Sequence, residues 1–162
     1  MPHRKPKVGD VVQLSLPDGR FAYGRVLRGS GVAFYREMSD RPGEPPIGST
    51  DFQFTVAVDV RILTSNDVPI VGHDPRVNEF EDWPPPAGVE DPIGVRHKVY
   101  FQGRMMVVSS LDEIRGLERA AVWDREDIVE RLVTGSYVDP VPYGEMGTPW
   151  TWAKHPKGKD PR

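Results

Sequence analysis

The first forty residues alternate between apolar and polar positions in a way that predicts three short β-strands. Apolar side chains occupy every second position over residues 10–16, which is the spacing of a strand with one buried face. Pro17-Asp18-Gly19 then predicts a tight turn into residues 21–27, and Gly29-Ser30-Gly31 predicts another into residues 32–35. We therefore expect an antiparallel meander, in which Gly24 marks a bend that coils the sheet toward a small barrel.

The most regular alternation in the chain lies at residues 52–63. Six apolar residues alternate there with more polar ones: Phe52, Phe54, Val56, Val58, Val60 and Ile62. A period of two over this length predicts a single long strand with one buried face, at the centre of the sheet.

The second half of the chain predicts one more hairpin and one helix. Residues 95–101 and 105–108 have strand patterns on either side of Gln102-Gly103. A helix is predicted over residues 124–134, with Asp124 as its N-cap and Gly135 just after its end. The fold class we expect is α+β and β-rich: a strongly coiled antiparallel sheet, similar to a small barrel, with one helix from the C-terminal half packed on it.

Proline punctuates the region between these two halves. Trp83-Pro84-Pro85-Pro86 and the residues up to Pro92 could connect two lobes, yet neither half is rich enough in predicted elements to fold alone. We expect a single domain over residues 1–162, with an ordered core at about 8–137. Residues 1–7 and 153–162, which are basic, are predicted to be solvated tails.

Composition narrows the possible functions. The chain has no cysteine, which excludes disulfides, thiolate nucleophiles and cysteine metal sites. No run approaches the ~20 apolar residues of a membrane span, and the N-terminus lacks the apolar stretch of a secretion signal, so we expect a cytoplasmic protein. The net charge of −3 argues against nucleic-acid binding. Aromatic and basic residues on the predicted hairpin keep a small-barrel nucleic-acid-binding module as a minor alternative.

A search for catalytic groups finds little. There is no serine nucleophile elbow, phosphate-binding loop or dinucleotide fingerprint. A metal-dependent hydrolase could use His73, Asp74 and His97 with Glu79 or Asp91, but these residues lack a recognised ligand spacing. We therefore assign no catalytic residue, metal or cofactor, and leave open whether the protein has any enzymatic activity. Arg25 could contact an anion or pack its stem at a barrel rim.

Two segments of the chain resemble a known family. The first is Val8-Gly9-Asp10-Val11-Val12 followed by Leu16-Pro17-Asp18-Gly19-Arg20-Phe21-Ala22-Tyr23-Gly24-Arg25-Val26-Leu27. The second is Gly116-Leu117-Glu118-Arg119-Ala120-Ala121-Val122-Trp123-Asp124, with Pro69-Ile70-Val71-Gly72 between the two. In this order they resemble the immunity protein 26 family of bacterial polymorphic toxin systems, over residues from about 8 to about 132. Val68 stands where that family leads us to expect an aromatic residue, so a different surface is expected there.

The resemblance implies a cytoplasmic protein that binds and neutralises a cognate toxin polypeptide. A phosphotriesterase-like activity has also been attached to this family, which keeps a metal-dependent hydrolase as the alternative. The resemblance supplies no catalytic residue and leaves the oligomeric state open. On the predicted helix, Glu126, Asp127 and Glu130 offer a basic toxin an acidic outer face, or are simply a solvated one.

The motif residues themselves are expected to be structural. A tryptophan just before a helix N-cap is well placed to fix that helix on a sheet. The residues assigned to this role are Gly9, Asp10, Gly19, Tyr23, Gly24, Leu117, Glu118 and Trp123.

Overall fold

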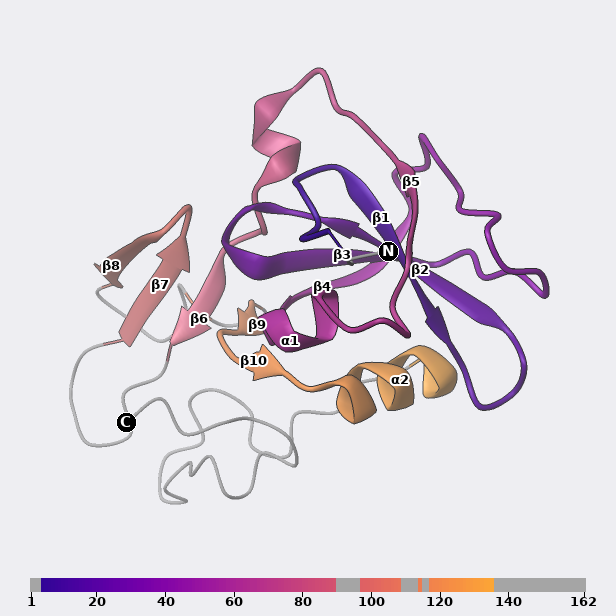
Figure 1. The fold of residues 1–162 in the computed structure, drawn as a ribbon. Helices are drawn as coiled ribbons and strands as arrows, with labels where there is room; N and C mark the ends of the chain where they lie inside the picture. The colour runs from indigo at the N-terminus through magenta and orange to yellow at the C-terminus, as the bar shows by residue number, and fades with distance from the viewer. Residues whose placement is uncertain (1–3, 90–96, 109–113, 115–116, 136–162) are drawn as a thin grey trace.

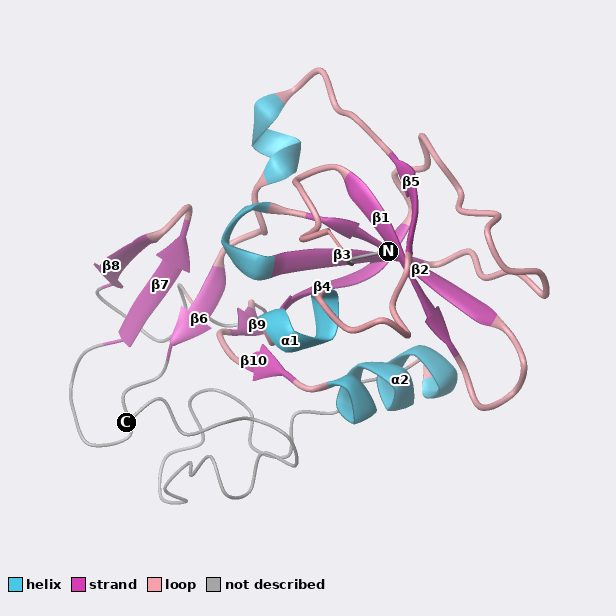
Figure 2. Ribbon diagram, viewed as in Figure 1, coloured by secondary structure: helices cyan, strands magenta, loops and turns pink. Residues whose placement is uncertain are grey.

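The protein folds into two β-sheets and one main helix (Figures 1 and 2). The structure is a computed structural model, and it describes residues 4–89, 97–108, 114 and 117–135. Within these residues no helix is long and apolar enough to cross a membrane. The smaller sheet lies beside the larger one, and the main helix runs below the larger sheet in the view of Figure 1.

The larger sheet, sheet A, has six strands in the order β10-β4-β3-β2-β1-β5. Its strands are β1 (Asp10–Ser15), β2 (Phe21–Val26), β3 (Gly31–Tyr35), β4 (Phe52–Val58), β5 (Ile70–His73) and β10 (Val122–Trp123). The predicted meander is confirmed, since β1 pairs with β2 and β2 with β3, both antiparallel. Gly24 of β2 leaves no room for a side chain beside the paired strand β3, since an added Cβ would come within 2.4 Å of Val32 Cγ1.

The prediction of one long strand over residues 52–63 is wrong in its second half. Strand β4 ends at Val58, and residues 60–63 form the short helix α1 (Val60–Leu63). Asp59 causes the change, since its side chain accepts a hydrogen bond from the Arg61 amide at 2.9 Å and so caps a helical turn. Nor is β4 central: β3 and β10 are its neighbours, and β10 is an edge of sheet A.

The smaller sheet, sheet B, has four strands in the order β8-β7-β6-β9. They are β6 (Ala87–Val89), β7 (His97–Phe101), β8 (Arg104–Val108) and β9 (Glu118–Arg119). The predicted second hairpin is confirmed, and Gln102 and Gly103 both adopt the positive φ that a two-residue turn requires. Strands β9 and β10 are almost consecutive, and each pairs in parallel with a different sheet, so this short segment joins the two sheets.

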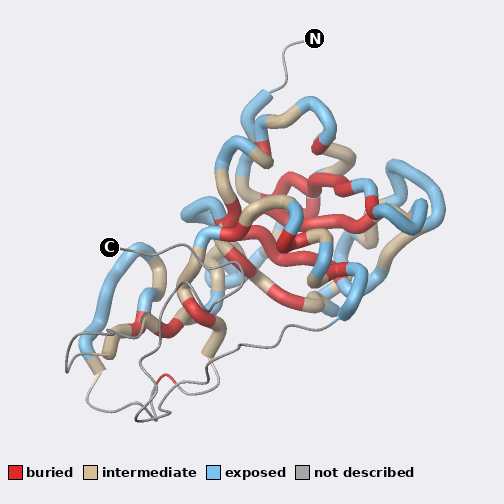
Figure 3. Tube along the Cα trace, turned by 90° about the horizontal axis from the view of Figure 1, so that it is seen from below, coloured by how far each residue is buried: buried red, intermediate tan, exposed pale blue. Residues whose placement is uncertain are grey.

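The main core lies on one face of sheet A, under the helix α2 (Arg125–Thr134). Trp123, Ile128 and Leu132 bring the C-terminal half of the chain into this core. Figure 3 shows the buried segments gathered in sheet A, whereas sheet B is mostly exposed or half-buried. The helix begins at the N-cap Asp124 and ends at Gly135, which adopts the left-handed conformation, both as predicted.

The α+β, β-rich fold class is confirmed, with a difference in the shape of the sheet. Sheet A is neither closed nor strongly curled, so the expected likeness to a small barrel is not seen. A closed barrel would need its two edge strands to pair, but β5 and β10 lie at opposite edges of sheet A and do not pair with each other. Two parallel pairings, β10 with β4 and β6 with β9, also make the sheets mixed rather than purely antiparallel.

Candidate interaction site on the second face of sheet A

The second face of sheet A is buried under loops and carries polar side chains. Alternation along β1 to β3 gives this face Val11, Tyr23 and Tyr35, together with the buried polar residues Gln13 and Arg25. An apolar face can be covered by any apolar surface, but hydrogen-bonding side chains select the backbone groups that lie above them. The second face is therefore built to hold two particular loops.

The first of these loops, residues 36–51, is held by two side chains. Gln13 Oε1 accepts a hydrogen bond from the Gly43 amide at 2.7 Å. The Tyr23 hydroxyl donates to the Arg41 carbonyl at 2.9 Å and accepts from the Glu44 amide at 3.2 Å. Both polar side chains thus fix the backbone of residues 41–44, next to the place where Ser39 pairs with Phe21 of β2.

The second loop follows β5 and is held by Arg25, which is only 1% exposed. Its Nε donates to the Asp74 carbonyl at 2.7 Å, and its Nη1 donates to the Glu81 carbonyl at 3.2 Å. Its Nη2 forms an ion pair with Asp82 at 2.6 Å. A single guanidinium on β2 therefore ties down both ends of residues 74–82.

Asp74 completes this buried network from the loop side. Its carboxylate accepts a hydrogen bond from the Tyr35 hydroxyl and another from Arg76 Nη2 at 2.8 Å. Burial, together with the neighbouring Asp74 carboxylate, raises the pKa of Tyr35, so its hydroxyl keeps its proton and donates. Arg76 Nη2 also donates to the Ser49 carbonyl at 2.6 Å, which ties the two loops to each other.

Above this network the chain forms a protruding segment, residues 77–81, which we call the acidic loop. It includes the first three residues of the 3₁₀ helix η2 (Glu79–Asp82), the coil above sheet A in Figure 1. Asn78 caps this helix, accepting a hydrogen bond from the Phe80 amide at 3.0 Å. Val77 is fully exposed and Phe80 is 67% exposed, so neither apolar side chain is covered by the fold.

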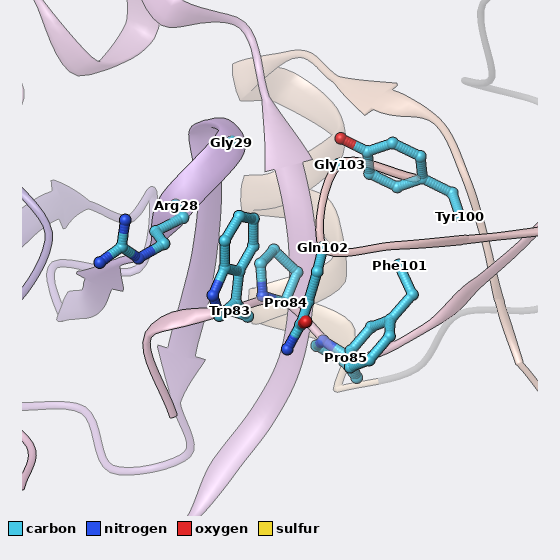
Figure 4. Close-up of a pocket in the computed structure, with 9 residues that line it drawn as sticks. All are labelled: Arg28, Gly29, Trp83, Pro84, Pro85, Tyr100, Phe101, Gln102 and Gly103. Atoms are coloured by element: carbon cyan, nitrogen blue, oxygen red, sulfur yellow. The ribbon is translucent and has the colours of Figure 1, made fainter. Parts of the chain in front are cut away.

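Where the two sheets meet, the chain leaves a cleft and a larger groove. In Figure 4, Trp83 lies between Arg28 and the hairpin residue Gln102, and the Arg28 guanidinium is 5.4 Å from the Trp83 ring centroid. This cleft has a volume of about 20 Å³, which is enough for no more than a water molecule. The neighbouring groove, about 440 Å³, lies between β4 and sheet B and is lined mainly by apolar residues, among them Val56, Met105 and Val122.

Comparison with known proteins identifies the family. The family model described as immunity protein 26 matches residues 7–98, which is more than half of the chain. The chain belongs to the immunity protein 26 family. No curated protein and no solved structure matches it. The matched residues include all of sheet A except β10, and the whole network around Arg25.

Most of the predicted motif residues stabilise the fold through turns, close contacts or burial in the core. Gly9 has a positive φ, and an added Cβ would come within 2.9 Å of His73 Cε1. Gly19 has a positive φ in the first hairpin turn. Glu118 accepts two hydrogen bonds from Arg131, at 2.6 and 3.0 Å, and so joins β9 to α2. Trp123 is buried in the main core, while Leu117 is half-buried.

Asp10 is the most highly connected of these motif residues. Its carboxylate accepts hydrogen bonds from Arg4 at 2.7 and 3.1 Å and from the Lys7 amide at 2.7 Å, and His73 Nδ1 lies 3.1 Å away. Burial opposes ionisation, but these partners together hold the pKa of Asp10 below its usual value. Residues 4–7, which we expected in a solvated tail, are thus attached to sheet A through Asp10; residues 1–3 and 153–162 lie outside the described residues.

The predicted acidic patch on α2 needs one correction. Glu126 and Glu130 are exposed, but Asp127 is only 4% exposed and does not lie on the outer face of the helix. It follows Asp124 by one helical turn, and its amide donates to the Asp124 carboxylate at 3.0 Å. A role of Glu126 and Glu130 in toxin binding stays a prediction.

The structure separates the residues that a metal-dependent hydrolase was expected to use. His73 lies on β5 and contacts Asp10, whereas Asp74 points to Tyr35 and Arg76. His97 lies on β7 of sheet B, and Asp91 is outside the described residues. In the part of the chain that the structure describes, no group of three histidine, aspartate or glutamate side chains could hold a metal ion.

Sequence reasoning missed the features that set this site apart. Arg25 was taken as an anion contact or a rim residue, yet it is among the most deeply buried side chains of the protein. Arg25 follows Phe21 and Tyr23 at every second position, so the alternation places it on the same face of the strand as these two aromatic residues. This pattern could have indicated that Arg25 is buried. Val68 is fully buried, so its departure from the family pattern alters the core rather than a surface. Phe80, between two glutamates, received no role.

Proposed function

We propose that this immunity protein binds a cognate toxin polypeptide of a bacterial polymorphic toxin system in the cytoplasm and neutralises it by forming a stoichiometric complex. The observation that carries the proposal is membership of the immunity protein 26 family, through the match over residues 7–98. Neutralisation by binding requires a surface of about 800 Å² on each partner, held in one conformation before the toxin arrives.

The second face of sheet A supports this proposal physically. Arg25, Tyr35 and Asp74 are buried and hydrogen-bonded, and they hold exposed loops rather than a catalytic pocket. Loops mounted on a rigid sheet are a common arrangement for recognition, because the sheet fixes the positions of the contact residues. A loop that is ordered in advance loses less conformational entropy when it binds.

The test is a titration against the toxin-like domain of a candidate toxin from the same bacterium. Toxin activity should fall linearly as the immunity protein is added and reach its minimum at one equivalent, with a 1:1 complex in calorimetry. Protection at well below one equivalent would indicate turnover and would contradict neutralisation by binding. Absence of both a complex and protection would refute the proposed function.

A further inference from the structure

Two apolar side chains on the acidic loop lack a structural role within the described fold. Val77 is fully exposed and Phe80 is 67% exposed, and they are three positions apart. Single exposed apolar residues are common on protein surfaces and need no explanation. Here, however, the two occur together on one short protruding segment whose backbone is held by several hydrogen bonds.

The backbone below these side chains is held at several points. Arg25 binds the Glu81 carbonyl and the Asp82 carboxylate, Asn78 caps the turn, and the Trp83 amide donates to the Phe80 carbonyl at 3.2 Å. A buried arginine is a costly way to secure a loop, since its charge must be removed from water. The outcome is an aromatic side chain presented from a backbone that is held in place, as suits an anchor residue at the centre of an interface.

The charges around Phe80 indicate what the partner surface should look like. Glu79 and Glu81 flank it and are exposed, whereas the charge of Asp82 is matched by Arg25. The apolar anchor therefore lies between two exposed carboxylates that form no ion pair with another described residue, so their charges can act on a partner. A complementary surface has an apolar pocket with lysine or arginine at its rim.

We propose that Val77 and Phe80 are the anchor residues with which this immunity protein docks into an apolar pocket, rimmed by lysine or arginine, on its toxin. The inference rests on the proposed function and adds to it the surface and the chemistry of the partner. Strand β8 also exposes apolar side chains, Met105, Met106 and Val107, but it begins at Arg104 and has Lys98 on the neighbouring strand, charges that a basic partner would repel.

Calorimetry and stopped-flow binding with the toxin test the proposal. Phe80→Ala should weaken the complex at least tenfold, which is about 1.4 kcal/mol, mainly through faster dissociation, and Val77→Ala should weaken it less. The double variant Glu79→Lys/Glu81→Lys should slow association at least tenfold and reduce its dependence on salt. Because all four side chains are exposed, each variant should retain the wild-type unfolding temperature.

Matched controls come from two other surfaces. Val107→Ala removes an apolar side chain of similar exposure, 63%, from β8. Glu126→Lys/Glu130→Lys reverses two charges on α2, the surface first predicted from the sequence. If the toxin docks on the acidic loop, both variants bind within twofold of wild type; if it docks on α2, as the sequence predicts, the α2 variant binds more weakly instead.

The possible outcomes separate the two proposals. If the wild-type protein binds the toxin and Phe80→Ala binds within twofold of it, the acidic loop is not the docking surface, while the proposed function stands. Equal or larger losses in the α2 or β8 control would transfer the docking surface to that element. If the wild-type protein itself does not bind, both proposals are overturned.

Discussion

Replacing Arg25 by methionine tests whether the second face of sheet A depends on one buried guanidinium. Methionine fills much of the same space but has no donors. The buried Asp74 carbonyl then loses its hydrogen bond from Arg25, which costs about 1–3 kcal/mol of stability. The Glu81 carbonyl and the Asp82 carboxylate lose partners where water can partly replace them, at about 0.2–1 kcal/mol each.

Together these losses lower the free energy of unfolding by about 3 kcal/mol. Part of this is offset, because the variant no longer has to remove the charge of a guanidinium from water. For a chain of this size each kcal/mol lowers the unfolding temperature by about 2–4 °C, so a decrease of roughly 6–12 °C is expected. Urea unfolding followed by tryptophan fluorescence measures the free energy directly. Hydrogen exchange adds a local reading, because the Glu81 and Trp83 amides should lose protection before the amides of β1 to β3.

Asp82→Asn is the matched control for this prediction. It keeps the shape of the side chain and removes only the ion pair, whose aspartate is 18% exposed, so less than about 1 kcal/mol should be lost. The reasoning is refuted if Arg25→Met unfolds within 1 kcal/mol of wild type. It is also refuted if Asp82→Asn is as destabilised as Arg25→Met, since the carbonyl bonds would then contribute nothing.

Three further predictions address other parts of the fold. Gly24→Ala should destabilise the protein by about 1–3 kcal/mol in urea unfolding, because the new methyl group would overlap Val32; a stability equal to wild type would contradict this close packing against Val32. The lowered pKa of Asp10 means that its contribution to stability is present above its unfolded pKa of about 3.9 and is lost as the pH falls through the folded value. The free energy of unfolding should therefore fall below about pH 4, and less steeply in Asp10→Asn; parallel curves would exclude this linkage. Glu118→Gln should cost about 1–2 kcal/mol by weakening the paired bonds to Arg131, with the amides of α2 losing protection first in hydrogen exchange.

Periodicity was sufficient to predict the strands that alternate and the helix that is capped. It predicted β1 to β4 because a strand buries every second side chain, and it predicted α2 because Asp124 and Gly135 mark the ends of a helix. It failed beyond Val58, where the local hydrogen bond of Asp59 to the Arg61 amide outweighs a continuing apolar alternation. A pattern of apolar positions gives no information about such a hydrogen bond.

The candidate site was harder to predict because long-range hydrogen bonds create it. Arg25 binds carbonyls of Asp74 and Glu81, far along the chain, and those segments are rich in proline and acidic residues and lack periodicity. Whether an arginine on a strand is buried depends on which loop covers it, and this is decided only in three dimensions. Asp127 illustrates the same limit, since a short helix beside a sheet buries more than its apolar stripe.

The segment that joins the two sheets also gives the protein an order of assembly. The described contacts that hold the acidic loop lie within residues 4–83, where β1 to β4 form antiparallel pairs between strands that are consecutive in the sequence. The opposite face of sheet A is completed only when Trp123, Ile128 and Leu132 arrive, after a parallel pairing that spans a long stretch of chain. On the ribosome, the face that carries the acidic loop can therefore form while the apolar face still awaits its cover. A chain stalled before Trp123 would present both at once, and its uncovered apolar face would make it a substrate for chaperones.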